Sequence, residues 1–539
     1  MADARLSQLP VELLSQGSVS ARLSQLCVEV ISGSVSTAIA FTVQVQLVAG
    51  VWTDITADVL AQADVKYGID GLGPADLVAS SGQFNFSLDN STRNSAATLG
   101  YYSPLHASHR TGWGYGIPCK LTMTYLGTGY VKHYGKIYSI DPEPGSRWGR
   151  QVHVTSYDAI RDFAEADART VSVQVNQSET TLLTAILAAL PTSAQPISTS
   201  FDTAVDSYAY AFANVGEGVK ALGLIADVAR SARGYVYITG AGVMRYQSRT
   251  TRATSTSAVT FTDTMAGLVL PSNLDGVYNR IRVTIHPKDV DGTSTHVLWA
   301  SLGTPVLIAA DATTEMWITY RDPDELSVLL GGTAMVAMVA NTDYVANEAA
   351  DGSGTDRTAL ITVTATYYAS TAKLTIVSGT SVGVYLTTLQ VRGARIRDLD
   401  DITVETYTAK SYGDRPFSFD MPYQSNHDVA NDAASEIYLS YSDPTAQALA
   451  LEFYGESGAL LTQALAREPG DRITLTETVT GATAVDAIIQ SVALDLRPGP
   501  QIVCRWGLAP LSYLASNSWI LGGLTGHHGE LGTGTYLGL

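Results

Sequence analysis

Two adjacent histidines near the end of the sequence are the first residues whose type could bind a metal. His527-His528 is the only such pair in the chain. Successive side chains on a strand point to opposite faces, so the two rings would chelate one ion poorly. Gly532-Thr533-Gly534 follows, but no helix comes after it, and a phosphate-cradling glycine loop needs one. We therefore predict neither a metal site nor a phosphate site in this stretch.

A glycine-rich loop and an isolated histidine are two further candidates for ligand binding. Asp351 and Asp356 flank Gly352-Ser353-Gly354-Thr355 and could coordinate Ca²⁺. A calcium loop of the EF-hand type needs more oxygen ligands at set positions and a closing glutamate, so we favour a plain hairpin loop. His286 ends a strand just before Pro287, and a surface histidine before a turn is favoured over a ligand.

The sequence offers no nucleophile elbow. Gly379-Thr380-Ser381-Val382-Gly383 has the spacing Gly-x-Ser-x-Gly, but it lies between two expected strands, 373–377 and 385–391, whereas the elbow leads from a strand into a helix. The sequence contains no His-Glu-x-x-His and no cysteine–histidine constellation. Cys27, Cys119 and Cys504 lie far apart, which excludes a metal-ligand spacing and a disulfide framework and indicates assembly in a reducing cytoplasm. We predict no catalytic, cofactor-binding or metal residues, no cofactor, and a chain that is not an enzyme. A glycosidase stays open as an alternative, because its two carboxylates can be distant in sequence.

Composition limits the class of partner. The formal net charge of −18 disfavours nonspecific binding to nucleic acid, which depends on lysine and arginine. The same charge could serve as a repulsive wall beside DNA, or it could merely keep the protein soluble. Charged residues make up 16% of the chain and it has 28 tyrosines, which suits a β-rich protein with large contact surfaces. No stretch approaches the roughly 20 apolar residues of a membrane span, and Met1–Arg5 does not open a signal peptide.

Two strand-rich blocks and two α+β segments are predicted from periodicity. Residues 51–163 alternate apolar and polar side chains between glycine and proline turns, which predicts a small closed barrel or sandwich. A second block of strands is expected at 473–506. Helical spacing predicts helices at 179–190, 216–233 and 428–441, and a β-sandwich insert is expected at 332–397. Each predicted helix has an apolar face that would pack into a core.

A repeat of 17 residues occupies the first part of the chain. Ala4–Leu14 recurs as Ala21–Ile31, and each copy ends in a serine- and glycine-rich turn. Each copy is expected to be a strand that pairs with another sheet or another subunit. A disordered leader is the alternative.

Several short motifs, taken in their order along the chain, resemble phage tail hub proteins. They are Trp52-Thr53-Asp54-Ile55-Thr56, Phe86-Ser87-Leu88-Asp89-Asn90-Ser91, Tyr102-Ser103-Pro104, Gly116-Ile117-Pro118, Asn279-Arg280-Ile281-Arg282-Val283, Tyr320-Arg321-Asp322-Pro323, Ser411-Tyr412-Gly413-Asp414-Arg415, Glu468-Pro469-Gly470-Asp471, Trp519-Ile520-Leu521-Gly522 and Glu530-Leu531-Gly532. The doubled leader also resembles segments of phage minor tail proteins. The family is related to the contractile-tail baseplate hub and to the spike-bearing hub of type VI secretion.

The resemblance implies a fold and a set of partners. The fold would be mainly β with α+β segments, with two hub barrels, a small α+β domain and an inserted β-sandwich. The expected units are 1–50, an N-terminal strand repeat or arm; 51–163, the first hub barrel; 164–265, the α+β domain; 266–331, the start of the second barrel; 332–397, the insert; 398–470, an α+β segment; and 471–539, the rest of the second barrel with C-terminal strands. Strands after Val277 would thus join those at 473–506.

The function implied by the resemblance is that of a virion structural protein at the tail tip, assembled in the host cytoplasm. Three copies would form a ring of six barrels that adapts a sixfold tail tube to a threefold tip and lines the channel for DNA ejection. The expected partners are two further copies in a homotrimer, a distal tail or tail tube ring, the tape measure protein, and tail fibre or tip proteins. No membrane span and no sequence-specific nucleic-acid binding are expected. The alternatives are a tail adhesin whose insert binds host carbohydrate and a tail-associated hydrolase.

Overall fold

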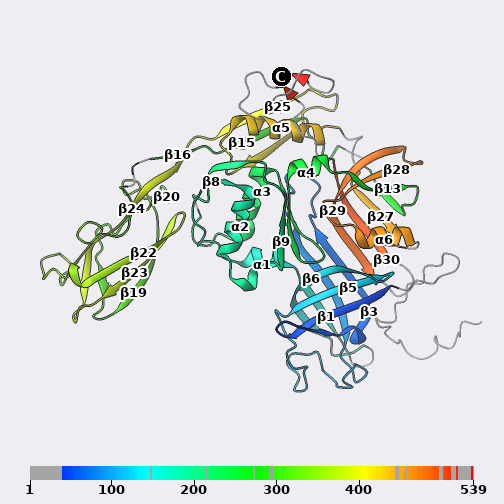
Figure 1. Cartoon of the computed structure of the whole chain (residues 1–539), viewed down its shortest axis with the longest axis horizontal. Coiled ribbons are helices and arrows are strands. Elements are labelled where there is room, and N and C mark those ends of the chain that lie inside the picture. The colour runs from blue at the N-terminus through cyan, green and yellow to red at the C-terminus, as the bar shows by residue number, and fades with distance from the viewer. Residues whose placement is uncertain are drawn as a thin grey trace, which may run out of the picture.

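The chain folds into two barrels, a central α+β unit and a peripheral lobe (Figure 1). The computed structural model describes residues 39–511 apart from 146–148, 214, 271–273, 292, 294, 444–447, 456–457 and 497–501, together with 518–519 and 536–537. Strands predominate over helices in this part of the chain, so the predicted mainly β fold class is confirmed. The leader repeat lies outside the described residues, as do the C-terminal motifs apart from Trp519.

Barrel one begins before residue 51. Its elements are β1 (Ala40–Val48), β2 (Val51–Asp54), η3 (Thr56–Asp58), β3 (Val59–Gly68), β4 (Ser80–Asp89), β5 (Pro118–Tyr125), β6 (Thr128–Pro142) and β7 (Gln151–Tyr157). The strands pair in the order β3-β4-β7-β6-β5-β1-β2. On β4, Phe84, Phe86 and Leu88 are buried and the residues between them are polar, which is the alternation expected of a half-buried strand.

The short helix η3 links the two ends of barrel one. The amide of Ile55 donates to the carbonyl of Val43 over 2.9 Å, and the amide of Val43 donates to the Thr56 hydroxyl over 2.9 Å. β1, next to last in this order, is thereby bonded to the segment that leads into β3, the first strand. This contact brings the two ends of the sheet together around its apolar core.

Barrel two is assembled from segments far apart in the chain. Its elements are β13 (Ser257–Thr262), β14 (Gly267–Val269), β27 (Ala450–Tyr454), α6 (Gly458–Ala466), β28 (Arg472–Glu477), β29 (Ala482–Leu496) and β30 (Ile502–Pro510). Helix α6 packs on the core that the two barrels share, through the side chains of Leu461, Ala464 and Leu465. All strands of both barrels belong to one 13-stranded sheet.

One strand assignment from the sequence is corrected. β15 (Arg280–Ile285), expected in barrel two, pairs instead with β25 (Ile402–Tyr407) and β26 (Pro416–Met421) in a separate sheet. Its buried residues Ile281, Val283 and Ile285 belong to the core of the central unit, where α5 (His427–Tyr441) covers the sheet. The apolar alternation identified the strand, but an alternation does not specify which sheet the strand joins.

The rest of the central unit lies between barrel one and the lobe. Its elements are α1 (Ala159–Glu165), β8 (Gln174–Ser178), α2 (Glu179–Ala189), η4 (Thr192–Ala194), β9 (Ser198–Phe201), β10 (Ser207–Ala211), α3 (Ala221–Ala232), β11 (Tyr235–Ile238), β12 (Val243–Gln247) and α4 (Arg249–Thr254). β11 and β12 form a hairpin, and β9 joins it in parallel.

The lobe lies at the end of the molecule away from the barrels (Figure 1). Its elements are β16 (Lys288–Val290), β17 (His296–Ala300), β18 (Val306–Ile308), β19 (Thr313–Thr319), β20 (Gly331–Thr333), β21 (Tyr344–Asn347), η5 (Thr358–Leu360), β22 (Ile361–Tyr367), β23 (Thr371–Ser378) and β24 (Val384–Asp398). It has its own hydrophobic core, which includes Leu298, Leu374 and Val391. β31 (Ser518–Trp519) and β32 (Tyr536–Leu537) pair with each other.

Candidate functional site: the joint between the barrels

The described part of the chain offers no metal-binding geometry. In the described part of the chain, no group of three or more histidine, cysteine or carboxylate side chains is placed to hold a metal ion. His527-His528 and Gly532-Thr533-Gly534 lie outside that part. Cys119 and Cys504 are buried free thiols. No helix among the described residues is long and apolar enough to cross a membrane.

The carboxylates of the glycine-rich loop are bound within their own turns. Asp351 accepts from the amide of Ser353 over 2.9 Å and from its hydroxyl over 2.6 Å. Asp356 accepts from the amide of Thr358 over 2.8 Å. These hydrogen bonds lower the pKa of both carboxyls. The two carboxylates thus stabilise the loop itself.

The two barrels are joined edge to edge by one antiparallel ladder. The second half of β29 pairs with β3, from Ser491 opposite Gly68 to Leu496 opposite Ala63. β29 also pairs with β28 along its first half and with β30 from Ala487 to Leu496. The hydrogen-bonded sheet of one barrel therefore continues into the other barrel across this joint.

A buried ammonium reinforces this joint. Lys132 of β6 is fully buried, and its Nζ donates to Glu468 Oε1 over 2.8 Å and to the carbonyl of Arg467 over 3.3 Å. The Tyr67 hydroxyl of β3 donates to the same carboxylate over 3.1 Å. The amide of Gly240, in the β11–β12 turn, donates to Glu468 Oε2 over 3.1 Å. Glu468 thus holds barrel one, barrel two and the central unit together.

Lys132 was not predicted from the sequence, and a β-bulge explains why. Leu121 of β5 lies opposite His133 and Thr122 lies opposite Val131, which leaves Lys132 as the extra residue of β6. The bulge places Lys132 and His133 in succession among the buried residues, against the alternation that a regular strand would show. No local pattern in the sequence signals such a bulge. The motif Glu468-Pro469-Gly470-Asp471 was identified in the sequence, but its contact with Lys132 was not predicted.

The strand pairing of the two barrels is nearly the same. Barrel one runs β3-β4-β7-β6-β5-β1 and barrel two runs β14-β27-β30-β29-β28-β13. Barrel one contains three successive antiparallel strands, β5–β6–β7, and barrel two contains three more, β28–β29–β30. The middle strand of each set has 15 residues. One pairing differs, because β1 is antiparallel to β5 whereas β13 is parallel to β28. By this correspondence β6 matches β29, and β14 matches β3.

The strands that correspond to the joint have free edges. β14 pairs only with β27 among the described strands, and the side chain of Val269 on it is 52% exposed. The ladder of β6 with β5 ends at Lys136, and Ile137 still exchanges backbone hydrogen bonds with Gly116 and Ile117. From Tyr138 to Pro142, β6 pairs with β7 alone among the described strands. Unpaired strand edges can accept a strand from another chain.

A long loop between β4 and β5 is fixed at the end of barrel one. Loop 90–117 is held by Asp58, which accepts from the Ser95 amide and hydroxyl over 2.6 Å each and from the Tyr102 hydroxyl over 2.5 Å. Arg110 donates to the Tyr102 hydroxyl over 2.9 Å, and the Trp113 indole donates to the Tyr102 carbonyl over 2.9 Å. Asp58 and Tyr102 are both buried. The loop therefore has a defined conformation without regular secondary structure.

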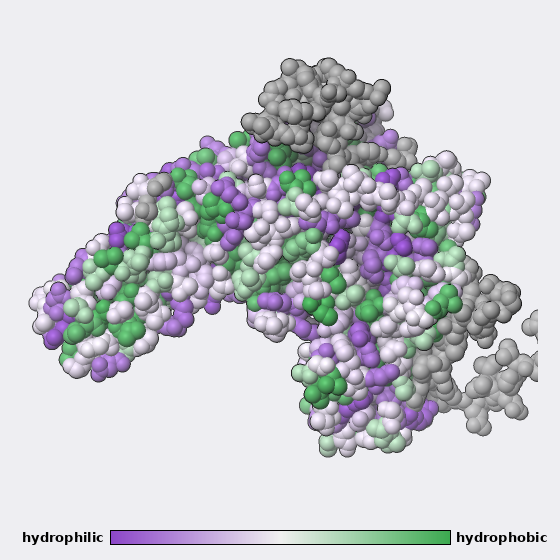
Figure 2. Space-filling view, viewed as in Figure 1, coloured by the Kyte–Doolittle hydropathy of each residue, from purple (hydrophilic) through white to green (hydrophobic). Residues whose placement is uncertain are grey.

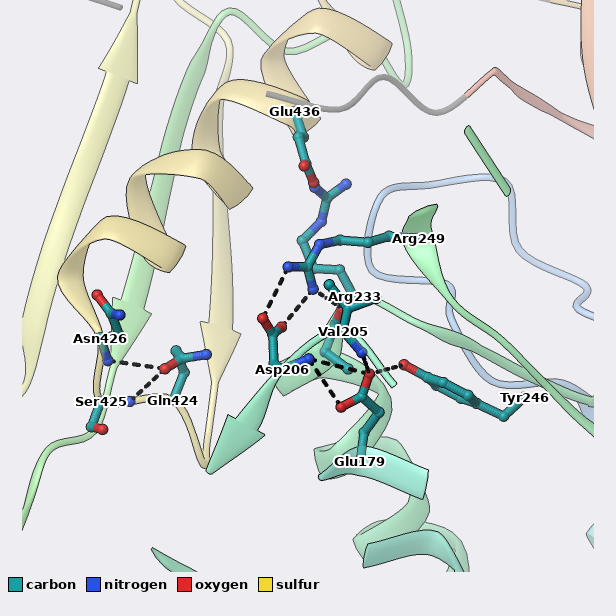
Figure 3. Close-up of polar contacts among 11 residues, drawn as sticks. Glu179, Val205, Asp206, Arg233, Tyr246, Arg249, Gln424, Ser425, Asn426 and Glu436 are labelled. Atoms are coloured by element: carbon teal, nitrogen blue, oxygen red, sulfur yellow. Dashed lines mark hydrogen bonds and ion pairs between the residues drawn. The ribbon is translucent and has the colours of Figure 1, made fainter. Parts of the chain in front are cut away.

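A second buried polar network lies in the central unit (Figure 3). Glu179 accepts from the amides of Val205 over 2.5 Å and Asp206 over 3.2 Å, and from the Tyr246 hydroxyl over 3.2 Å. Burial raises the pKa of Glu179. Arg249 forms two hydrogen bonds to Asp206, at 2.6 and 3.1 Å.

The same network extends to α5. Arg233, the left-handed residue that ends α3, pairs with Glu436, and both side chains are buried. Gln424 accepts from the amides of Ser425 and Asn426 at the start of α5, at 3.0 and 2.9 Å (Figure 3). Buried charges that are paired and hydrogen-bonded in this way fix the relative positions of α2, α3, α4 and α5.

His286 occupies the neck between the central unit and the lobe. Its Nδ1 lies 2.6 Å from Asp401 and its Nε2 lies 2.5 Å from Asp420. Burial lowers the pKa of His286, but the hydrogen bonds and charges of Asp420 and Asp401 outweigh burial and raise it above 6.5. A cavity of about 400 Å³ adjoins it, lined by residues that include Asp227, Lys288, Asp398 and Tyr423. His286 thus holds the ends of β25 and β26 together, beside the chain segments that lead into the lobe.

Comparisons with known proteins gave structural matches only. No family model and no curated protein matches the sequence. The 43 kDa tail protein of prophage MuSo2 from Shewanella oneidensis aligns over 87% of this chain and 98% of its own, at 9% identity and a TM-score of 0.45. The tail protein from Neisseria meningitidis MC58 aligns over 87% of this chain and 96% of its own, at 9% identity and 0.42.

A type VI secretion component gave a third match. This E. coli protein, described as structurally similar to tail proteins of bacteriophage T4, aligns over 88% of this chain and 78% of its own, at 8% identity and a TM-score of 0.35. These three solved structures are two tail proteins and one component of a type VI secretion system.

Proposed function

We propose that this chain is a structural virion protein, the trimeric hub at the distal end of a phage tail. In this role it adapts a sixfold tail tube to a threefold tip and lines the channel for DNA ejection. The observation that carries the proposal is the repeated barrel topology. Each copy supplies two corresponding barrels, so three copies supply six similar positions in one ring.

The free edges supply the contact between copies. Within one copy the second half of β29 pairs with β3. The corresponding elements, the second half of β6 and β14, can pair between one copy and the next. Such an interface is head-to-tail, and it closes into a ring when the rotation per copy divides a full turn. The partners above and below this ring are a distal tail or tail tube ring, the tape measure protein, and tail fibre or tip proteins.

The mass of the assembled protein tests the ring. We expect light scattering to give three times the chain mass of 57.1 kDa. Val269→Lys places a charge on the β14 edge and is expected to shift the protein toward monomer. Leu307→Lys, at a 60% exposed position on the lobe, is the matched control and should leave the mass unchanged. A wild-type protein that stays monomeric at all concentrations would contradict the hub.

The channel function has its own test. The net charge of −18 favours a lining that repels a polyanion and lets DNA slide past. We expect the assembled protein to bind no double-stranded DNA at physiological salt in a filter-binding assay. Tight binding that weakens steeply with added salt would indicate a basic lining and would contradict this part of the proposal.

A tail adhesin that binds host carbohydrate through the lobe is the alternative. One observation favours it: Trp317, 38% exposed, stacks with Tyr368 at 5.4 Å, and an exposed aromatic pair can bind a sugar ring. However, the Arg169 guanidinium of the central unit lies 4.5 Å from the Trp317 ring centroid, so contacts within the chain already occupy part of this surface. Binding of the isolated protein on a glycan array, lost in Trp317→Ala, would support the adhesin.

A further inference from the structure

Two apolar side chains stand out among the described residues because they are almost fully exposed. Leu105 in loop 90–117 is 101% exposed, and Val479 in the turn between β28 and β29 is 92% exposed. Leu105 belongs to barrel one and Val479 to barrel two. Loop 90–117 forms the end of barrel one away from the central unit, where hydrophobic residues reach the surface (Figures 1 and 2).

Leu105 and Val479 lie on segments whose counterparts in the other barrel contact each other at the joint between β3 and β29. Loop 90–117 connects β4 to β5, and its counterpart in barrel two is the connection 455–471 between β27 and β28. The turn that carries Val479 corresponds to the turn at Leu126 and Gly127 between β5 and β6.

The internal joint shows what such a connection does. Connection 455–471 leaves barrel two and reaches barrel one, where its Glu468 and the Arg467 carbonyl accept from Lys132 of the β5–β6 hairpin. Its Gly458 lies beside the Tyr125 hydroxyl of the same hairpin, because a Cβ on Gly458 would be 2.9 Å from that oxygen. A connection of one barrel thus packs against the first hairpin of the next barrel.

Loop 90–117 extends further from its barrel than connection 455–471 does. Connection 455–471 folds inward as α6, and the turn residue Leu126 keeps 68% of its surface exposed. Loop 90–117 contains no helix and projects Leu105 outward. It can therefore contact the turn itself as well as the hairpin behind it.

The charges of the two surfaces are complementary. Loop 90–117 contains Arg93, Arg110, His106 and His109 and no aspartate or glutamate. The turn at Val479 is bordered by Glu477, which accepts from the amides of Val479 and Thr480, and by Asp263, which accepts from Thr478. These hydrogen bonds lower the pKa of both carboxyls, so the turn is negatively charged at neutral pH.

We propose that loop 90–117 of one copy docks on the β28–β29 hairpin of a second copy, with Leu105 covered by the turn that carries Val479. The partner is a second copy of this chain, and the inference rests on the proposed ring. Burial of the two apolar side chains favours the contact, and the opposite charges orient it.

The test uses the full-length protein and three variants. Leu105→Glu removes the apolar tip and opposes Glu477 and Asp263, and it is expected to weaken self-association at least tenfold in sedimentation equilibrium. Leu105→Glu combined with Val479→Lys restores a complementary pair and is expected to recover most of that loss. Leu302→Glu, at a 55% exposed leucine of the lobe, is the matched control and should change nothing. Unchanged circular dichroism will confirm that each variant is folded.

A disulfide trap supplies an independent readout. Leu105→Cys with Val479→Cys should yield covalent oligomers on mild oxidation, whereas either single variant should not. This docking would be overturned, and the ring left intact, by the following result: the wild type assembles, Leu105→Glu assembles equally well, and the double cysteine variant forms no cross-link. A wild-type chain that does not assemble would overturn the ring itself.

Discussion

The Lys132 ammonium, completely enclosed between two barrels, is neutralised by Glu468, which lies 336 residues further along the chain. The pair forms at a bulge of β6 and links the ladder between β3 and β29 to the turn before β28. The pair therefore holds together parts of the chain that no short-range interaction could join.

Removal of Glu468 should strongly destabilise the protein. Glu468→Ala leaves the Lys132 charge buried without a carboxylate, which typically costs about 3–5 kcal/mol of folding free energy. Glu315→Ala breaks the pair between Lys373 and Glu315, whose side chain is 55% exposed, and should cost less than about 1 kcal/mol. Urea unfolding at neutral pH measures both. Equal effects of the two substitutions would show that the buried pair does not stabilise the joint.

The neck at His286 should loosen as pH rises. A neutral imidazole donates one hydrogen bond, whereas both nitrogens of His286 face carboxylate oxygens, so the geometry requires the protonated ring. The raised pKa means that this stabilisation is complete below pH 6.5 and is lost as pH rises through the folded-state pKa.

Hydrogen exchange can detect this loosening. Lys288 pairs with Asp398 beside the histidine, and Asp227, Asp401 and Asp420 also face the region. We expect amides at 286–290 and 398–402 to exchange faster above the His286 pKa than below it, after correction for the intrinsic pH dependence. His286→Gln should abolish the difference. A pH-independent exchange pattern in the wild type would contradict a protonated clamp.

Asp158 should make the protein less stable toward alkaline pH. This buried residue caps α1 by accepting from the Ile160 amide over 3.0 Å, and burial raises its pKa to about 8. The folded state therefore binds a proton that the unfolded state releases near pH 4, and stability falls as pH rises from about 4 to 8. Asp158→Asn keeps a capping oxygen without a charge, so its melting temperature should match or exceed the wild type at pH 8. Asp158→Ala, which loses the cap, should instead cost about 1 kcal/mol.

Tyr102 should control the order of loop 90–117. Tyr102→Phe removes the hydroxyl that donates to Asp58 and accepts from Arg110, and it leaves part of the buried Asp58 carboxylate unsatisfied. We expect a loss of about 1–3 kcal/mol and faster proteolysis within the loop. Tyr115→Phe, at a 63% exposed position in the same loop, is the control and should behave as wild type. Proteolysis unchanged in Tyr102→Phe would show that other contacts fix the loop.

Local elements were largely predictable from the sequence. The helix expected at 179–190 is α2, and the alternating residues at 84–88 lie on β4. The helix expected from Gly216 begins at Ala221, because Gly218 has a φ of +84° and Lys220 is extended. Arg233 takes the left-handed conformation that ends it.

The joint was not predictable in the same way. Pairing between β3 and β29 depends on free backbone groups at two distant edges, and neither edge differs in local pattern from a strand paired nearby. Burial of Lys132 depends on a bulge, and the role of His286 depends on Asp401 and Asp420, which are more than a hundred positions away. Charged residues in a sequence are normally expected at the surface, so only the assembled structure identifies these partners.

The ladder between β3 and β29 also constrains the order of events during translation. When the ribosome has finished β7, barrel one has all its own strands, but the outer edge of β3 still lacks its neighbour. The residues that cover this edge, from Ser491 to Leu496, emerge more than 400 positions after Gly68. At roughly 5–20 residues per second, the nascent chain carries an open strand edge for on the order of half a minute. Newly made copies thus have an interval in which chaperone binding, or pairing with the wrong chain, competes with completion of the fold.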